Sequence, residues 1–419
     1  MTASGERERY PGWSVVAAAF VVLMVSAGLG FYGLAVYLNA FSRERGWEVA
    51  SVSLATTVFF LVGGVMGLGI ARVLTRRDAR QVVVFGGVVG AGALVALGQA
   101  RHPWHLFVLY GLFAVGWACA GLVPATTVVT RWFHVKRSVA LSVASTGLSV
   151  GGIVITPFAK WLLDTYGLEA GTPWLGLIWF VGIVPVTLAL LHSDPAAKGW
   201  LPDGERARRD APPPVFSGTP YEQAVRTRLY WAITLAYALV QGSQVGAIQQ
   251  LVRLMEERTD RATATLATTT LAATSVVARL AGGRLAPRID MMRLTVALAL
   301  AQGGALALLG AMEVRWGLFA TIVVFGATVG NLLMLHPLLI AEHFGVGDYP
   351  RIFGRSQFVV VFGTAAGPLL LGWLRDNAGG YRTSYLVAGA CSVAGAAVLF
   401  GGRDRPRATT PATTTVSAS

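Results

Sequence analysis

The sequence predicts an all-α membrane protein with twelve transmembrane helices, divided into two halves of six by a polar central segment. Hydrophobic residues make up 54% of the 419 residues and charged residues only 13%, against about 25% charged in a typical soluble domain. Twelve apolar stretches are close to the length of about 20 residues that crosses the hydrocarbon of a bilayer. They show no alternation of apolar and polar residues, which favours helices over barrel strands.

The twelve predicted spans follow one another along almost the whole chain. Their approximate limits are residues 13–41, 50–74, 81–99, 105–130, 138–165, 173–192, 229–252, 262–287, 293–311, 316–341, 352–374 and 383–402. The first span is too long for the apolar core of a signal peptide and has no A-x-A cleavage site, so we expect it to remain a helix. The eighth, rich in Thr and Ala, is the least hydrophobic, and we expect it to be shielded from lipid.

The central segment, residues 193–228, differs from the spans in composition. It contains several prolines and mixed charge, which predicts a flexible cytoplasmic linker. The linker would join an N-terminal six-helix bundle at residues 1–192 to a C-terminal bundle at residues 229–402. Residues 403–419 are rich in Thr, Ala, Ser and Pro and predict a disordered cytoplasmic tail.

The basic residues predict the orientation of the chain. With the N-terminus inside, 23 of the 34 Lys and Arg residues fall in cytoplasmic segments and 9 in outside segments, while Lys160 and Arg279 lie within spans. This bias is the positive-inside rule, and it places both termini in the cytoplasm. The net charge of +13 is then a topology signal with a secondary attraction to anionic lipid headgroups, and it does not indicate nucleic-acid binding.

The composition also argues against several classes of site. Cys119 and Cys391 both lie in apolar runs, which disfavours a disulfide framework, and the six histidines show no metal-ligand spacing. The chain has no recognisable nucleophile–base pair and no phosphate-binding loop. We therefore expect neither an enzyme nor a bound metal or cofactor.

Five short motifs give the chain its resemblance to a known family. They are GW at Gly46–Trp47, RWFHVKRSVAL at Arg131–Leu141, YEQAVRTRLYW at Tyr221–Trp231, AEHFG at Ala341–Gly345 and GTAAGPLLLG at Gly363–Gly372. Together with the two six-span halves and the long central loop, they resemble the major facilitator superfamily (MFS). Within it they resemble the bacterial monocarboxylate and oxalate/formate transporter branch. The resemblance covers the chain apart from its tails and most of the central loop.

The resemblance implies two pseudo-symmetric six-helix bundles (the MFS fold) and secondary active transport by alternating access. It implies a small, monocarboxylate-like organic anion as substrate, moved by proton symport or by exchange, across the bacterial cytoplasmic membrane. We expect the chain to act as a monomer in contact with membrane lipids. The alternative is an efflux pump for drugs or amphipathic metabolites, although the spans hold no deep Asp or Glu to drive cation export.

Arg279 is the residue that most directly suggests a substrate. It lies within Ala264–Ala286, where a guanidinium is costly at membrane depth and cannot lose its proton. Its own helix offers no nearby acid, so a substrate carboxylate could supply the anion and accept two hydrogen bonds. The resembling animal-type carriers have an Asp one turn earlier, where this chain has Ser275, which weakens the case for a protein-borne proton. The alternative is that Arg279 snorkels toward Arg284 and Arg288 at the inner interface.

Uncharged polar side chains are the other candidates for a substrate pocket. Tyr237, Gln241 and Gln244 share one stripe of the seventh span at spacings of four and three residues. Tyr110 in the fourth span and Asn331 in the tenth complete the predicted pocket. Each of the five is equally compatible with a role in interhelical contact or interfacial anchoring.

His336 is a candidate for proton coupling because a histidine titrates near neutral pH. The alternative is a structural histidine that bonds a nearby backbone carbonyl. Asn331 lies five residues earlier, about 140° around the helix, so the two side chains cannot both point squarely at one site.

Two basic loops, Gly67–Arg80 and Gly282–Arg293, stand where the superfamily has a Gly-x-x-x-Asp-Arg-x-Gly-Arg pattern. In the family this pattern pairs charges with helix ends and latches one conformation. Here Pro287 stands where the acid of the second loop would fall, so the resemblance implies a weaker latch. Its predicted residues are Arg76, Arg77, Asp78, Arg288 and Asp290. The alternative is that the arginines only set the topology.

Overall fold

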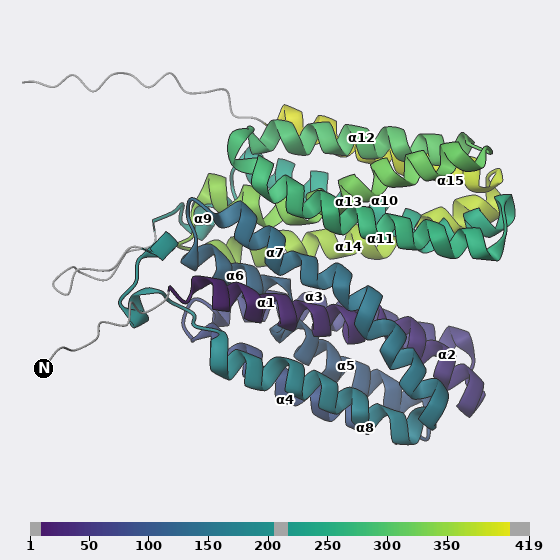
Figure 1. The fold of residues 1–419 in the computed structure, drawn as a ribbon, viewed down its shortest axis with the longest axis horizontal. Coiled ribbons are helices and arrows are strands. Elements are labelled where there is room, and N and C mark those ends of the chain that lie inside the picture. The colour runs from purple at the N-terminus through teal and green to yellow at the C-terminus, as the bar shows by residue number, and fades with distance from the viewer. Residues whose placement is uncertain (1–9, 205–216, 403–419) are drawn as a thin grey trace, which may run out of the picture.

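The computed structural model describes residues 10–204 and 217–402 (Figure 1). Regular structure in these two ranges is helical, apart from isolated bridge positions, which include the antiparallel pair Gly218 and Gly345. Helices follow from the apolar composition, because lipid offers the backbone no hydrogen bonds and a helix satisfies its own N–H and C=O groups. The middle of the predicted linker, residues 205–216, and the predicted tail, residues 403–419, lie outside the described residues.

The first half of the chain contains six spans, of which three are assembled from more than one element. The elements are α1 (Gly12–Ser26), the π-helical turn η1 (Ala27–Phe31), α2 (Gly33–Arg45), α3 (Val49–Val73), α4 (Ala79–Leu97), α5 (Pro103–Cys119), α6 (Leu122–Trp132), α7 (Arg137–Val150), the π-helical turn η2 (Gly151–Ile155) and α8 (Thr156–Leu190). The first span consists of α1, η1 and α2, and the fourth consists of α5 and α6. The fifth span consists of α7, η2 and the first part of α8. The left-handed backbone of Gly167, with φ 72°, divides α8 between the fifth and sixth spans.

The second half contains six further spans, each a single long helix. Its elements are α9 (Tyr221–Ala224), α10 (Arg228–Arg258), α11 (Arg261–Leu285), the short turn η5 (Ala286–Arg288), α12 (Met291–Ala311), α13 (Arg315–Phe344), α14 (Tyr349–Asn377) and α15 (Gly380–Gly401). Two short 3-10 turns, η3 (Ala196–Lys198) and η4 (Pro202–Gly204), precede it in the linker.

These helices account for the twelve predicted spans. In the described ranges, nine stretches are long and apolar enough to cross a membrane, and one of these, Arg137–Leu190, contains two spans. Helices α10 and α11, of 31 and 25 residues, are long enough to cross a membrane but are less apolar than most of the other spans. The expectation that the Thr-rich eighth span is shielded is wrong for one face of α11, where Leu266 and Val277 are 54% and 67% exposed.

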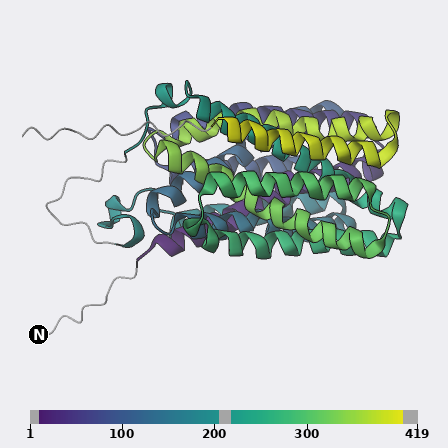
Figure 2. The same cartoon turned by 90° about the horizontal axis from the view of Figure 1, so that it is seen from above.

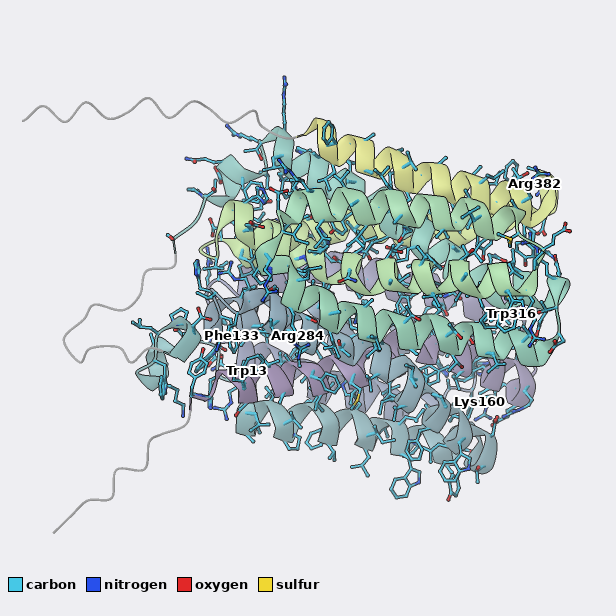
Figure 3. All side chains as sticks on the ribbon, turned by 45° about the horizontal axis from the view of Figure 1, so that its top comes forward. Trp13, Phe133, Lys160, Arg284, Trp316 and Arg382 are labelled. Carbon is cyan, nitrogen blue, oxygen red and sulfur yellow. The ribbon has the colours of Figure 1, made fainter. Side chains whose placement is uncertain are left out.

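The helices gather into two groups whose long axes run in similar directions (Figures 1 and 2). The first bundle comprises α1–α8 and the second bundle α10–α15 (Figure 1). Helix α1 begins and α15 ends near the linker, as an even number of crossings requires (Figure 1). Lys160, Trp316 and Arg382 lie at the opposite end (Figure 3). Charged and aromatic residues at span ends are typical of the membrane–water interface.

The described start of the linker is docked on the first bundle. The carboxylate of Asp203 accepts hydrogen bonds from the backbone N–H groups of His134, Val135 and Lys136 at 2.9, 2.8 and 3.1 Å. These three residues precede α7, so a linker carboxylate satisfies amides at the entrance of the fifth span. Burial and the charge of Asp203 raise the pKa of Tyr10 to about 12. The hydroxyl of Tyr10 donates a hydrogen bond to the carbonyl oxygen of Trp132, the last residue of α6, at 2.5 Å.

Glycines allow close helix packing within each bundle, and two neighbours in α12 provide a test. We expect Gly303→Val to destabilise the protein and Gly304→Val not to. A Cβ atom at Gly303 would lie 2.6 Å from Cγ2 of Val393 and 2.9 Å from the carbonyl oxygen of Gly389 in α15, whereas one at Gly304 would meet nothing within 4 Å. Such overpacking costs about 1–3 kcal/mol. Thermal unfolding of the purified protein in detergent measures the difference, and equal midpoints would contradict this packing.

Candidate functional site

Arg279 lies at the contact between the two bundles. Only 1% of the residue is exposed. Its Nε donates to the carbonyl oxygen of Gly330 in α13 at 2.8 Å, and its Nη1 donates to that of Ser145 in α7 at 2.5 Å. Its own carbonyl accepts a hydrogen bond from Oγ of Ser142 at 2.7 Å. One guanidinium therefore joins the second bundle, to which it belongs, to the first.

The charge of Arg279 has no anionic partner in the described part of the chain. None of the ion pairs there involves it, and its Nη2 has no hydrogen-bond partner among the described residues. Carbonyl dipoles balance a full charge incompletely in a region of low dielectric. The snorkelling alternative is wrong for this structure, because the guanidinium is buried between helices while Arg284 and Arg288 are exposed.

Two π-helical turns, η1 and η2, lie against each other within the first bundle. Oγ1 of Thr156 donates to the carbonyl oxygen of Gly28 at 2.9 Å, and a Cβ atom at Gly28 would lie 2.8 Å from the carbonyl oxygen of Gly151. A π turn adds one residue to a helical turn and is frequent at functional sites. The glycines explain the close approach, and the extra residues change the faces presented by the first and fifth spans.

Tyr32 follows η1 directly. Its ring packs against Gly152 in η2, where a Cβ atom would lie 2.9 Å from the ring. Turn η2 continues α7, whose Ser145 carbonyl accepts the hydrogen bond from Arg279. Of the Tyr32 residue, 39% is exposed. A tyrosine in an apolar span was the available signal, but nothing in the local sequence revealed the π turn that orients it.

Asn331 is the predicted pocket residue that the structure brings to Arg279. Its side chain packs on Gly282, one turn after Arg279, where a Cβ atom would lie 1.6 Å from Oδ1. Its Nδ2 donates to the carbonyl oxygen of Ala327 at 2.9 Å, and its Oδ1 has no partner in the described chain. Asn331 thus places an unpartnered acceptor against α11, one turn from Arg279 in the chain.

His336 belongs to a separate polar cluster inside the second bundle. Its Nε2 lies 2.9 Å from Oγ of Ser356, which also accepts a hydrogen bond from Oγ1 of Thr234 at 2.9 Å. Its ring stacks on Tyr237 with centroids 4.3 Å apart. The expected backbone-carbonyl partner is therefore wrong, since the partner is a serine hydroxyl. Tyr237 is brought to His336 rather than to Arg279.

Three further residues of the predicted pocket are buried and take part in none of the contacts described above. They are Gln241, Gln244 and Tyr110. Gln241 and Gln244 are 6% and 4% exposed, and each has one amide atom without a partner among the described residues. Tyr110 lies in the interior of the first bundle, with its ring 6.4 Å from that of Phe59. No hydrogen bond or ring contact within the described ranges links these three residues to Arg279.

The two acids of the predicted latch cap helices within their own bundles. Asp78 caps α4 by accepting from the backbone N–H of Arg80 at 2.8 Å, and Asp290 caps α12 by accepting from that of Arg293 at 2.6 Å. The two caps occupy equivalent places, at the start of the third span of each half. The arginines of the predicted latch are exposed: Arg76, Arg77 and Arg288.

Small residues bring the bundles together in the halves of their helices nearest the linker. A Cβ atom at Gly283 of α11 would lie 2.4 Å from Cβ of Ser142 in α7, and one at Gly354 of α14 would lie 2.5 Å from Cβ of Ala71 in α3. A Cβ atom at Gly64, nearer the middle of α3, would lie 3.5 Å from the ring of Phe358. These contacts close the linker-side half of the interface.

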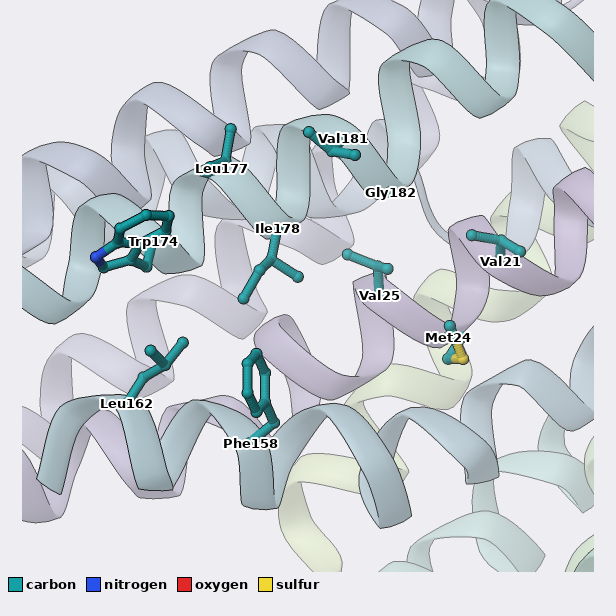
Figure 4. A pocket seen from close by; sticks show the side chains of 10 residues that line it. All are labelled: Val21, Met24, Val25, Phe158, Leu162, Trp174, Leu177, Ile178, Val181 and Gly182. Atoms are coloured by element: carbon teal, nitrogen blue, oxygen red, sulfur yellow. The ribbon is translucent and has the colours of Figure 1, made fainter. Parts of the chain in front are cut away.

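A hollow of about 470 Å³ lies elsewhere, between α1 and both arms of α8 (Figure 4). Apolar residues line it, and several, including Phe158, Trp174 and Val181, are exposed on the surface of the spans. It offers no group that could bind an anion. The candidate anion site is therefore the surroundings of Arg279.

Comparison with known families identifies the chain at the level of its fold and class. A model of the Major Facilitator Superfamily matches residues 18–330 and, in an overlapping second match, residues 251–417. The chain belongs to this superfamily. The predicted MFS fold and membrane location are thereby confirmed, and the relatives are superfamily transporters rather than enzymes.

Curated relatives of this superfamily member carry the name of one transporter class. Monocarboxylate transporter 11 of Homo sapiens is 28% identical over 410 residues, which cover 93% of this chain and 82% of the relative. Monocarboxylate transporter 13 of Bos taurus is 26% identical over 403 residues, covering 93% and 88%. The resemblance to monocarboxylate transporters is confirmed, but these relatives are mammalian and give no support to the expected bacterial origin.

Solved structures of the superfamily agree with the fold. FucP, a superfamily transporter in the outward conformation, superposes with a TM-score of 0.71 at 16% identity, covering 94% of this chain and 99% of that one. At this identity the likeness concerns the arrangement of helices alone.

Proposed function

We propose that this superfamily transporter is a secondary active carrier of a small, monocarboxylate-like organic anion and works by alternating access. The observation that carries the proposal is the buried guanidinium of Arg279, which lies between the bundles without an anionic partner among the described residues. A carboxylate would supply the missing charge through charge-assisted hydrogen bonds. The names of the relatives support the same substrate class.

Binding at Arg279 would connect recognition to movement of the bundles. A carboxylate can accept a hydrogen bond from the unused Nη2 and compete with the carbonyl of Ser145 for Nη1. The bond from Nη1 to Ser145 crosses the interface between the bundles, so its replacement weakens that contact. Asn331 can contact a polar substituent, and Gln241, Gln244 and Tyr237 remain proposed contacts on α10. Tyr110 packs on Phe59 in the interior of the first bundle and is not part of the proposed pocket.

Coupling and orientation complete the proposal. Because Ser275 stands in place of an acid, we favour either a proton that travels with the substrate or anion exchange. His336, which lies away from Arg279, is the proposed residue for proton coupling through the protein. The excess of basic residues in the linker and the loops on its side supports cytoplasmic termini. The closed half of the interface would then be cytoplasmic and the structure outward-facing. We propose that the chain acts as a monomer. We propose that the charged loops next to α4 and α12 assist latching in another conformation.

Uptake by proteoliposomes tests the transport proposal. We expect labelled acetate, pyruvate or phenylacetate to enter faster than in protein-free liposomes, with further acceleration by an inward proton gradient or by unlabelled anion inside. The protein-free liposomes, under the same gradient, measure passive entry of the neutral acid. Accumulation of cationic or neutral amphipathic compounds alone would overturn the proposal and favour efflux.

A further inference from the structure

Aromatic side chains from three spans of the first bundle form a continuous cluster about halfway along the spans. The ring of Phe31 lies 5.0 Å from that of Tyr32 and 5.9 Å from that of Phe60, centroid to centroid. The ring of Phe60 lies 6.3 Å from that of Trp117. These four residues, from η1, the start of α2, α3 and α5, are the aromatic wall.

The aromatic wall faces the second bundle rather than the lipid. Phe60 lies one turn from Gly64 on the same face of α3, and Gly64 contacts Phe358 of α14. At one end of the wall, Tyr32 packs on Gly152 of η2, which continues α7, and α7 carries the Ser145 carbonyl that Arg279 binds. The wall therefore borders two elements, α3 and α7, that contact helices of the second bundle.

The members of the wall are partly exposed, although they lie deep in the spans. Phe31, Phe60 and Trp117 have intermediate exposure, and Tyr32 is 39% exposed. By contrast, Phe59, the neighbour of Phe60, is fully buried in the first bundle. Apolar rings that are left uncovered inside an interface favour an apolar ligand, because removing them from water is favourable. Phe358 closes this region on the linker side.

We propose that the substrate of this carrier is a monocarboxylate with an aromatic or similarly large apolar group, whose carboxylate meets Arg279 and whose apolar group packs on the aromatic wall. The inference rests on the proposed function. A ring against the wall gains edge or offset contacts. Acetate would satisfy the guanidinium but leave the wall uncovered, so the site discriminates by the size of the apolar group.

Ligand-dependent thermal stabilisation of the purified full chain in detergent tests the inference. Sodium acetate and sodium phenylacetate are the two probes, and the half-maximal concentration of each is measured. We expect phenylacetate to act at a concentration at least about tenfold lower than acetate, because several added carbons enter an apolar region. Phe60→Ala should reduce this ratio to about threefold or less. Phe85→Ala, on an exposed face of α4 where Phe85 is 55% exposed, is the matched control and should leave the ratio unchanged.

The outcomes separate this inference from the proposed function. Equal half-maximal concentrations for the two probes, with both responses lost in Arg279→Gln, would overturn the aromatic specificity and keep the anion site. A tenfold preference that survives Phe60→Ala unchanged would also overturn the role of the wall. Stabilisation by both probes that survives Arg279→Gln would overturn the anion site itself. Absence of stabilisation by either probe in the unmodified chain would overturn both proposals.

Discussion

Arg279→Gln is expected to reduce monocarboxylate uptake by proteoliposomes at least about tenfold. Hydrogen bonds to charged groups contribute about 1.5–3 kcal/mol each, and about 1.4 kcal/mol corresponds to a factor of ten. Glutamine can still donate one hydrogen bond to the carbonyl of Gly330 or Ser145, which limits the damage to the contact between the bundles. Arg279→Lys keeps the charge but loses the planar fork, so we expect an intermediate rate.

Arg284→Gln is the matched control for this prediction. Arg284 lies on the same helix, is exposed, and among the described residues donates only to the carbonyl of Leu280 in its own helix, at 3.2 Å. Its loss should leave uptake and the thermal unfolding midpoint unchanged. Normal uptake by a folded Arg279→Gln variant would contradict the binding role. Unfolding of both Arg279 variants would point to a structural role, which the thermal midpoints would show directly.

The spans and the place of Arg279 within one of them were predictable because each depends on local composition. Hydropathy reports burial in lipid residue by residue, so twelve apolar stretches gave twelve spans. The caps at Asp78 and Asp290 were also within reach of the sequence, since an acid immediately before a helix commonly accepts its free N–H groups. A family pattern led instead to their assignment as a latch.

The contacts of the site could not be predicted, because they depend on which helix faces which. Arg279 donates hydrogen bonds to the backbone carbonyls of Ser145 and Gly330. Every residue type has a backbone carbonyl, so the sequence does not mark these acceptors. One stripe of α10 contains Tyr237, Gln241 and Gln244. The ring of Tyr237, however, stacks on His336 and does not contact Arg279. Tyr32 owes its position to η1, and a π turn leaves no clear mark in composition. The periodicity of the sequence therefore predicted which residues share a helix face, but not which neighbouring helix each face contacts.

Gly283→Val is expected to open the linker-side contact between the bundles and to slow transport. A Cβ atom at Gly283 would lie 2.4 Å from Cβ and 2.7 Å from Oγ of Ser142, and 3.1 Å from the carbonyl oxygen of Ser138. All three atoms belong to α7 in the other bundle, so relief requires the bundles to separate rather than a helix to unfold. Overpacking by about 1–3 kcal/mol shifts a two-state equilibrium about fivefold to somewhat more than a hundredfold.

Labelling of a single cysteine can follow this shift. Ser138→Cys is introduced with Cys119→Ala and Cys391→Ala, and its reaction with a polar maleimide is timed in detergent. Ser138 is 2% exposed in this structure, so labelling should be slow and should accelerate at least about fivefold with Gly283→Val. Gly69→Val, where a Cβ atom would meet nothing within 4 Å, is the control and should change neither labelling nor uptake. Because alternating access requires this contact to form and break, faster labelling must accompany slower uptake. Unchanged labelling and uptake in Gly283→Val would show that the contact does not gate transport.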